Sequence, residues 1–167
     1  MHRKGTLPRP TSVEYHAWVH KSFYDEMPDE FRVIEHPYGT QEPIVPGRMR
    51  QDDDREVAVG CHLPPSSSRV AAFMDHFDKQ FQIAARSSNG RIIAIASAHH
   101  RLNYIYLFPD GNGRVSRLMS HAMALTAGIG GQGLWSVSRG LARGLTDRGE
   151  YKRMMDLADS PRRGDRD

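Results

Sequence analysis

Residues 108–117 read FPDGNGRVSR, and this stretch carries the strongest signal in the chain. Its two glycines flank Asn112 where a loop turns into a helix, and glycine reaches backbone conformations that other residues avoid. The first N–H groups of a helix lack partners within the helix, and the helix N-terminus carries a partial positive charge. Such a turn can therefore gather several N–H groups around one anion.

Three charged side chains extend this site toward a polyphosphate. Arg114 and Arg117 stand three residues apart, so both can face one ligand from the first turns of the helix. Guanidinium groups bind phosphate oxygens bidentately. Asp110 offers a hard oxygen that suits Mg²⁺ held mainly by phosphates. The same residues also fit an ordinary turn, in which Asp110 caps the helix and the arginines make surface ion pairs.

Helical spacing of apolar residues continues on both sides of this stretch. Thr11 and Glu14 form a capping box for a first helix that runs to about Tyr24, and Pro64-Pro65 precede a second helix with Phe77 on its apolar face. After a turn at Ser87–Gly90, a mostly buried central helix is expected over Arg91–Ile105. Three later helices are expected: from the glycine loop to a cap at Gly128, over Leu134–Arg143 and over Arg148–Ala158.

A different pattern separates the first two helices. Prolines and glycines break Ile34–His62, and Val57–Val59 reads as a short β segment, which predicts a small hairpin. The last residues, 160–167, have nothing to bury, so we expect a flexible tail. The predicted fold class is all-α: one domain over residues 1–167, a helical bundle with a small β-hairpin flap at about 42–62.

Composition narrows the class of protein further. The chain has 167 residues with a single cysteine, Cys61, so an intrachain disulfide and a cysteine-rich zinc site are excluded. No segment approaches the ~20 apolar residues that a membrane helix needs. The 23 Lys and Arg residues against 20 Asp and Glu residues give a net charge of +3, too small an excess to favour a nucleic-acid partner. We expect a soluble cytoplasmic domain with no membrane contact.

With its flanks, the glycine loop resembles the signature of the Fic family, His-Pro-Phe-x-Asp/Glu-Gly-Asn-Gly-Arg-x-x-Arg. Residues 106–117 read YLFPDGNGRVSR, which matches every motif position except the first two. Outside this stretch, Pro46-Gly47 with Arg50 and residues 57–60 with Pro64-Pro65 are similar to the family's flap and its exit, and His99 stands where a histidine is common in the family. Residues 134–141, Tyr151-Lys152 and residues 158–162 are similar to one bacterial subgroup.

The resemblance implies an enzyme that transfers the AMP part of ATP to a hydroxyl group of a target protein. The resemblance also implies that Asp110 holds Mg²⁺. Asn112 and the backbone of Gly111 and Gly113 would bind the α- and β-phosphates. Arg114 would neutralise the β/γ end of the triphosphate, with Arg117 assisting. Phe108 would anchor the loop in the core. Residues near 43–60 of the flap would hold the protein substrate as an added strand.

The first motif position is the departure that matters, because the family's general base is a histidine and this chain has Tyr106. A histidine, with a reference pKa of ~6.5, is mostly neutral at pH 7, whereas a tyrosine, at ~10, is about a thousandfold short of its ionised form. Losing a positioned base costs ~10²–10⁴ in rate, so we expect nucleotide binding with slow transfer. His99 and His100 lie one and a half to two helical turns away, and His62 would need a long reach from the flap. Leu107 replaces the motif proline, a milder change.

Two further points concern regulation and the competing hypotheses. Members of the family are commonly inhibited by a Ser/Thr-x-x-x-Glu-Gly/Asn helix, and residues 146–151 (TDRGEY) share its spacing without its last residue. Inhibition by a separate protein is therefore one possibility that the sequence leaves open. The alternative to an enzyme is a catalytically silent domain that binds nucleotide or protein.

Overall fold

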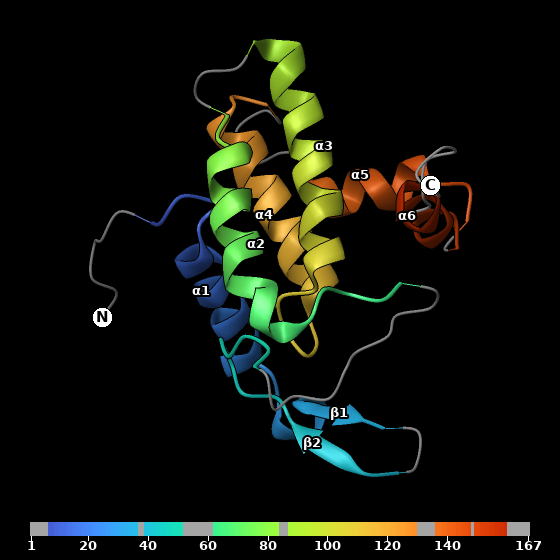
Figure 1. Ribbon diagram of the computed structural model, residues 1–167. Helices are drawn as coiled ribbons and strands as arrows, with labels where there is room; N and C mark the ends of the chain where they lie inside the picture. Colours follow the sequence, from blue (N-terminus) through green and yellow to red (C-terminus); the bar gives the residue numbers. More distant parts are fainter. Residues whose placement is uncertain are drawn as a thin grey trace, which may run out of the picture.

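Six α-helices and one short β-hairpin make up the computed structural model (Figure 1), which describes residues 7–36, 39–51, 62–83, 87–129, 136–147 and 149–159. In chain order, the elements are α1 (Val13–Asp25), the 3₁₀ turn η1 (Asp29–Phe31), β1 (Val33–Glu35), β2 (Gln41–Pro43), α2 (Ser67–Gln80), α3 (Ser88–Ile105), α4 (Asn112–Thr126), α5 (Val137–Gly144) and α6 (Glu150–Asp159). The predicted all-α class with a small hairpin is confirmed.

The arrangement of the helices places the end of α3 and the start of α4 at one end of the bundle. α3 packs against α2 and α4, and α4 also contacts α1 and α5. The hairpin lies beyond the lower end of α1, and α5 and α6 extend to the side opposite α1 (Figure 1). The core includes Met74 and Phe77 of α2, Leu102 and Ile105 of α3, and Met119 and Met123 of α4.

The caps explain where the helices begin and correct two expectations. Ser12, and not Thr11, caps α1 by accepting the Tyr15 N–H at 3.2 Å, because the Thr11 hydroxyl donates to Asp78 on α2 at 2.6 Å. Ser87 caps α3 by accepting the Gly90 N–H at 3.3 Å. The expected turn at Ser87–Gly90 is therefore mostly the first turn of α3, which begins three residues before the predicted Arg91.

Burial also differs from expectation in α3. Its buried residues are Ala94, Ala98, Leu102 and Ile105, while Ile92 and Ile93 are 57% and 67% exposed. In the first half of α3, Ile92 and Ile93 were expected to be buried and are instead exposed to solvent. The shorter α4 has more buried residues than α3, so α4 and not α3 is the central helix. Gly128 ends α4 with φ +72°, as predicted, and the Ile129 N–H donates to the Ala124 carbonyl at 2.8 Å.

A hairpin lies at residues 33–43, at the start of the Ile34–His62 segment for which one was predicted. Its strands pair antiparallel, with Val33 opposite Pro43 and Glu35 opposite Gln41, so the expected start near residue 42 falls within the second strand. The β segment expected at Val57–Val59, residues 52–61 of the flap and the tail 160–167 lie outside the described residues. The last two helices begin two to three residues later than predicted, although residues 134, 135 and 148 are not described. No helix in the described ranges is both long and apolar enough to cross a membrane.

Candidate functional site

The loop between α3 and α4 is fixed at its start by a buried arginine. Tyr106 ends α3 in the left-handed conformation, with φ 53° and ψ 64°, and it is the only non-glycine residue with positive φ among those described. Arg50 is 6% exposed and donates to the carbonyls of Tyr106 at 2.6 Å, Ile105 at 3.1 Å and Pro65 at 2.9 Å. Its own backbone N–H donates to the Leu107 carbonyl at 3.0 Å. These bonds satisfy carbonyls at the end of α3 and hold Tyr106 in an unusual conformation.

Asn112 closes the same loop from the other side. Its side-chain oxygen accepts the Phe108 N–H at 2.9 Å, and its side-chain nitrogen donates to the Phe108 carbonyl at 2.7 Å. Asn112 is buried, so its amide is engaged within the loop, whereas the resemblance implied a direct role in the phosphate cradle. The N–H groups of the first turn of α4 are the remaining donors for an anion there.

Phe108 anchors the loop in the core, as expected. Its ring is 1% exposed and stacks on the buried His20 ring of α1, with 4.0 Å between centroids and 18° between planes. His20 Nδ1 accepts the Gly47 N–H at 2.8 Å, so a neutral His20 carries its proton on Nε2, which lies 3.3 Å from the Asp110 carbonyl. Burial lowers the pKa of His20 to about 4, which keeps the ring neutral.

Asp110 and Arg114 form a polar cluster with aromatic residues of α1. The Asp110 carboxylate accepts hydrogen bonds from the Tyr24 hydroxyl and from Arg114 Nη2, the second at 2.7 Å. The Arg114 guanidinium also lies 4.7 Å from the centroid of the Phe23 ring and 5.2 Å from that of Tyr24. Burial and the hydrogen bond to Asp110 raise the pKa of Tyr24, so this phenol remains a donor.

Gly111 is required by its backbone conformation and by the Tyr24 ring, and Gly113 lies close to Arg117. Gly111 has φ +80°, and a Cβ there would come within 3.0 Å of the Tyr24 ring. A Cβ at Gly113 would come within 3.2 Å of Arg117 Nη1. Because Gly111 has no side chain, Tyr24 of the α1 cluster can pack against it. Because Gly113 has none, the Arg117 guanidinium can lie close to the first turn of α4.

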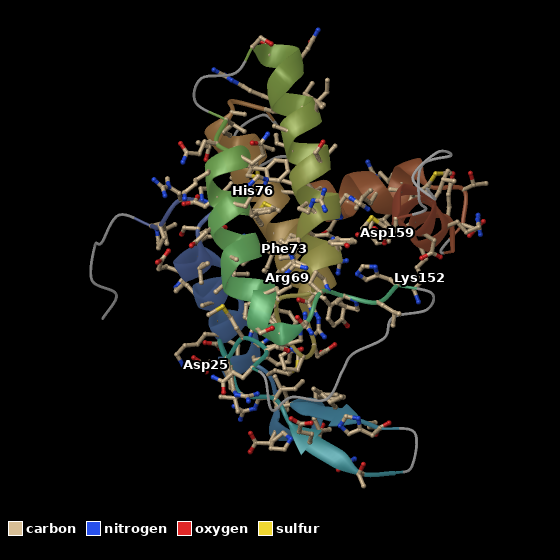
Figure 2. All side chains as sticks on the ribbon, viewed as in Figure 1. Asp25, Arg69, Phe73, His76, Lys152 and Asp159 are labelled. Atoms are coloured by element: carbon tan, nitrogen blue, oxygen red, sulfur yellow. The ribbon has the colours of Figure 1, made fainter. Side chains whose placement is uncertain are left out.

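A cavity of about 400 Å³ opens where the loop meets α6. Three residues of the predicted site line it: Tyr106, Gly113 and Arg117. The other lining residues are His62, Asn103, Tyr151, Lys152, Met155, Asp156 and Asp159. Asp110 and Arg114 do not line this cavity, so the structure divides the predicted residues between the cavity and the α1 cluster. Lys152 and Asp159 are marked on α6 in Figure 2.

Sequence reasoning missed the contribution of α6 and of His62. Only the resemblance of Tyr151-Lys152 to one subgroup pointed to α6, because helical periodicity does not show which distant segment a helix faces. The long reach expected for His62 is wrong: His62 lines the same cavity as Tyr106, and its Nε2 lies 2.9 Å from the Tyr104 carbonyl.

His99 on α3 is hydrogen-bonded through both ring nitrogens, and it ties α6 to α4. The Ser120 hydroxyl donates to the Ser116 carbonyl at 2.8 Å, so it accepts from His99 Nδ1 at 2.9 Å. Burial lowers the pKa of His99 to about 4, and the neutral ring has Nε2 left to accept from the Tyr151 hydroxyl at 2.7 Å. The Tyr151 hydroxyl therefore donates to His99, His99 donates to the Ser120 hydroxyl, and Ser120 donates to the Ser116 carbonyl.

The chemistry of the donor set fits Mg²⁺ only as part of a metal–nucleotide complex. Asp110 is the one carboxylate of the loop, its side chain is 41% exposed, and both hydrogen bonds described for it reach the same oxygen, Oδ2. Within the described ranges, no group of three or more His, Cys, Asp or Glu residues is placed to hold a metal. A single hard oxygen beside a phosphate site suits Mg²⁺, which keeps waters and binds phosphates.

The glutamate of the TDRGEY segment has a structural role. The Glu150 carboxylate accepts the Thr146 N–H, and the Asp147 carboxylate accepts the Glu150 N–H at 2.9 Å. Both carboxylates therefore cap the start of α6. The pKa of Asp147 is lowered, first by its hydrogen bond with Arg153.

Comparison with known proteins agrees with the geometry. The family model "Fic/DOC family" matches residues 10–124. A protein adenylyltransferase Fic of Drosophila ananassae is 36% identical over 90 residues, covering 54% of this chain and 18% of that protein. A protein adenylyltransferase Fic of Aedes aegypti is 30% identical over 110 residues, covering 66% of this chain and 21% of that protein. The chain thus spans about a fifth of the length of these relatives.

Among solved structures, the chain is similar to the N-terminal FIC domain of the Bep8 protein from Bartonella sp. 1-1C. The TM-score is 0.46 at 19% identity, and the match covers 92% of this chain and 74% of that one. The type IV secretion system effector protein BepA gives a TM-score of 0.47 at 16% identity over 75% of this chain and 43% of that one.

Proposed function

The chain belongs to the Fic/DOC family, and from this we propose that it transfers the AMP part of ATP to a hydroxyl group of a target protein. The observation that carries the proposal is the cavity shared by Tyr106, Gly113 and Arg117 at the N-terminus of α4. It combines a helix N-terminus with the guanidinium of Arg117, which lies close to Gly113, and these two features together suit a polyphosphate. Relatives named protein adenylyltransferase support the class of reaction.

The residues divide the work of binding ATP. Arg117 and the first N–H groups of α4 would bind the phosphates in the cavity. Asp110 would hold Mg²⁺, which supplies charge neutralisation on the phosphate oxygens when bound. Arg114 is placed by Asp110 and by the rings of Phe23 and Tyr24, so its role at the β/γ end requires it to exchange Asp110 for phosphate oxygens.

The transfer step needs a proton acceptor. The oxygen of the target hydroxyl bonds to the α-phosphorus, the bond from that phosphorus to the bridging oxygen breaks, and pyrophosphate leaves. The hydroxyl proton must go to a base during this step. Tyr106 stands at the position of the family's base, and burial followed by the charge of Asp110 raises its pKa further above neutrality. A neutral phenol cannot take this proton efficiently, so slow transfer is part of the proposal.

Label transfer from α-labelled ATP to lysate proteins tests the proposal. We expect weak labelling by the wild-type chain and ~10²–10⁴-fold faster labelling after Tyr106→His, which restores an imidazole at the base position. Phe31→His is the control, because it puts an imidazole at an exposed position of η1 that does not line the cavity. If Tyr106→His also transfers nothing to any protein, the enzyme proposal is wrong.

Tyr106 also supports a second candidate, a catalytically silent nucleotide-binding domain. This candidate predicts that Mg-ATP binds while neither the wild type nor Tyr106→His labels a target. For either candidate, a bound protein would add a strand to the flap at about 42–62, of which residues 52–61 lie outside the described residues. An inhibitory protein would place a carboxylate on Arg117, because Glu150 is engaged at the start of α6.

A further inference from the structure

The α6 side of the nucleotide cavity is attached to the bundle by polar contacts. α6 supplies five of the cavity's ten lining residues, yet none of the residues of Glu150–Asp159 is buried. Two of its apolar residues, Met154 and Leu157, are 54% and 68% exposed. Burial of apolar surface therefore contributes little to holding this wall, and specific hydrogen bonds must fix its position.

One carboxylate makes most of this attachment. Asp159, at the end of α6, accepts from His100 Nε2 on α3 at 2.8 Å and faces His62 Nδ1 at 3.4 Å. The side chains of Asp159 and His62 are 17% and 11% exposed, so water screens this contact poorly. We call His62, His100 and Asp159 the α6 clamp. His62 and Asp159 line the cavity themselves, so the clamp is part of the wall that it holds.

The clamp depends on a proton. His62 Nε2 lies 2.9 Å from the Tyr104 carbonyl, which can only accept, so this nitrogen carries a hydrogen. A neutral His62 would then turn the lone pair of Nδ1 toward the Asp159 carboxylate. Both contacts are favourable only when both ring nitrogens carry hydrogens, which makes His62 a cation. Histidine is the side chain that gains or loses this charge near neutral pH.

Several other charges surround the clamp. Asp159 is the carboxylate in direct contact with His62, whereas the nearby cations disfavour a second positive charge. The Arg101 guanidinium lies 5.1 Å from the centroid of the Tyr104 ring, which itself lies 5.0 Å from the His62 ring. The titratable and charged groups around the clamp are His99 and Arg101 on α3, Tyr106 at its end, Arg117 on α4, and Tyr151, Lys152 and Asp156 on α6.

We propose that Asp159 is a positioning residue for the nucleotide site: clamped between His62 and His100, it holds α6 as the cavity wall, and the hold requires the proton on His62. The inference rests on the proposed function for its ligand, but the attachment of α6 stands by itself.

Hydrogen exchange without nucleotide tests the attachment directly. In the wild-type chain, the contacts of Asp159 should protect the amides of residues 150–159 from exchange. Asp159→Asn and His62→Gln should both lower this protection under the same conditions. Asp75→Asn and His76→Gln, at exposed positions on α2, are matched controls that should behave as the wild type.

Titration with Mg-ATP tests the positioning role. Removing one charge-assisted hydrogen bond predicts roughly tenfold weaker binding by Asp159→Asn than by the wild type. The proposal is overturned if Asp159→Asn leaves both the exchange of α6 and the affinity unchanged. The wild type could bind no Mg-ATP while Asp159→Asn and His62→Gln still lower the protection of α6 from exchange. In that case the proposed function is wrong and the attachment of α6 by the clamp is supported. Circular dichroism checks that each variant remains helical.

Discussion

Replacing Gly111 by alanine tests the geometry of the loop with a matched control in the same chain. Gly111 has φ +80° and Gly128 has φ +72°, so an L-residue is strained at both positions. The two sites differ in their surroundings: a Cβ at Gly111 would lie 3.0 Å from Tyr24 Cε2 and 3.1 Å from its hydroxyl, while a Cβ at Gly128 meets nothing within 4 Å.

The difference between the two variants can be estimated. Left-handed strain costs about 1 kcal/mol for either alanine. At Gly111 the Tyr24 ring must also move, which breaks its hydrogen bond to the Asp110 carboxylate, and hydrogen bonds to charged groups contribute about 1.5–3 kcal/mol. We therefore expect Gly111→Ala to lower the free energy of unfolding by about 3 kcal/mol and Gly128→Ala by about 1 kcal/mol.

Urea unfolding followed by circular dichroism measures both losses under the same conditions. A folded domain has about 5–15 kcal/mol of stability, so both variants should remain folded enough to compare. Equal losses for the two alanines would refute the reasoning, because they would show that Tyr24 does not pack against the loop as described.

Three other outcomes follow from buried polar groups. Asn112→Ala leaves the Phe108 N–H and carbonyl without their partner and should cost about 3 kcal/mol in urea unfolding, whereas a loss below about 1 kcal/mol would contradict the loop closure described. Acid should destabilise the fold, because burial lowers the pKa values of His16 and His20 to about 4 while unfolded histidines titrate near ~6.5. The unfolded chain binds more protons in this window, so stability falls by roughly 1.4 kcal/mol per pH unit per histidine from about pH 6.5 to 4, and a urea midpoint that is flat between pH 7 and 5 would contradict this. Ser120→Ala removes the acceptor of His99 Nδ1 and should increase hydrogen exchange in α6 through Tyr151, which unchanged exchange would refute.

Local patterns predicted most of the helices, because apolar spacing reflects which face is buried. They failed where a distant residue decided the outcome. Thr11 and Ser12 can both cap a helix, and the choice fell to Ser12 because Asp78 on α2 engages Thr11. The apolar run containing Ile92 and Ile93 predicted burial, but these two side chains are 57% and 67% exposed.

The candidate site shows the same limit. The glycine loop and Arg117 could be read from the motif, since their chemistry is local. The buried Arg50 that holds Tyr106, and the wall built by α6, depend on contacts across 56 and 52 residues, between Arg50 and Tyr106 and between His99 and Tyr151. Spacing within one helix carries no information about such partners. The division of the two arginines between the cavity and the α1 cluster also required the three-dimensional structure.

Calorimetric titration with Mg-ATP is the most direct test of the central claim, that the cavity at the start of α4 binds a triphosphate. Arg117→Ala removes the cationic side chain that α4 presents to the cavity, and Arg139→Ala removes an equal charge from an exposed position on α5. The account predicts that the wild type and Arg139→Ala bind alike and that Arg117→Ala binds at least about tenfold more weakly. Equal affinity of all three chains, or no binding by the wild type, would contradict it.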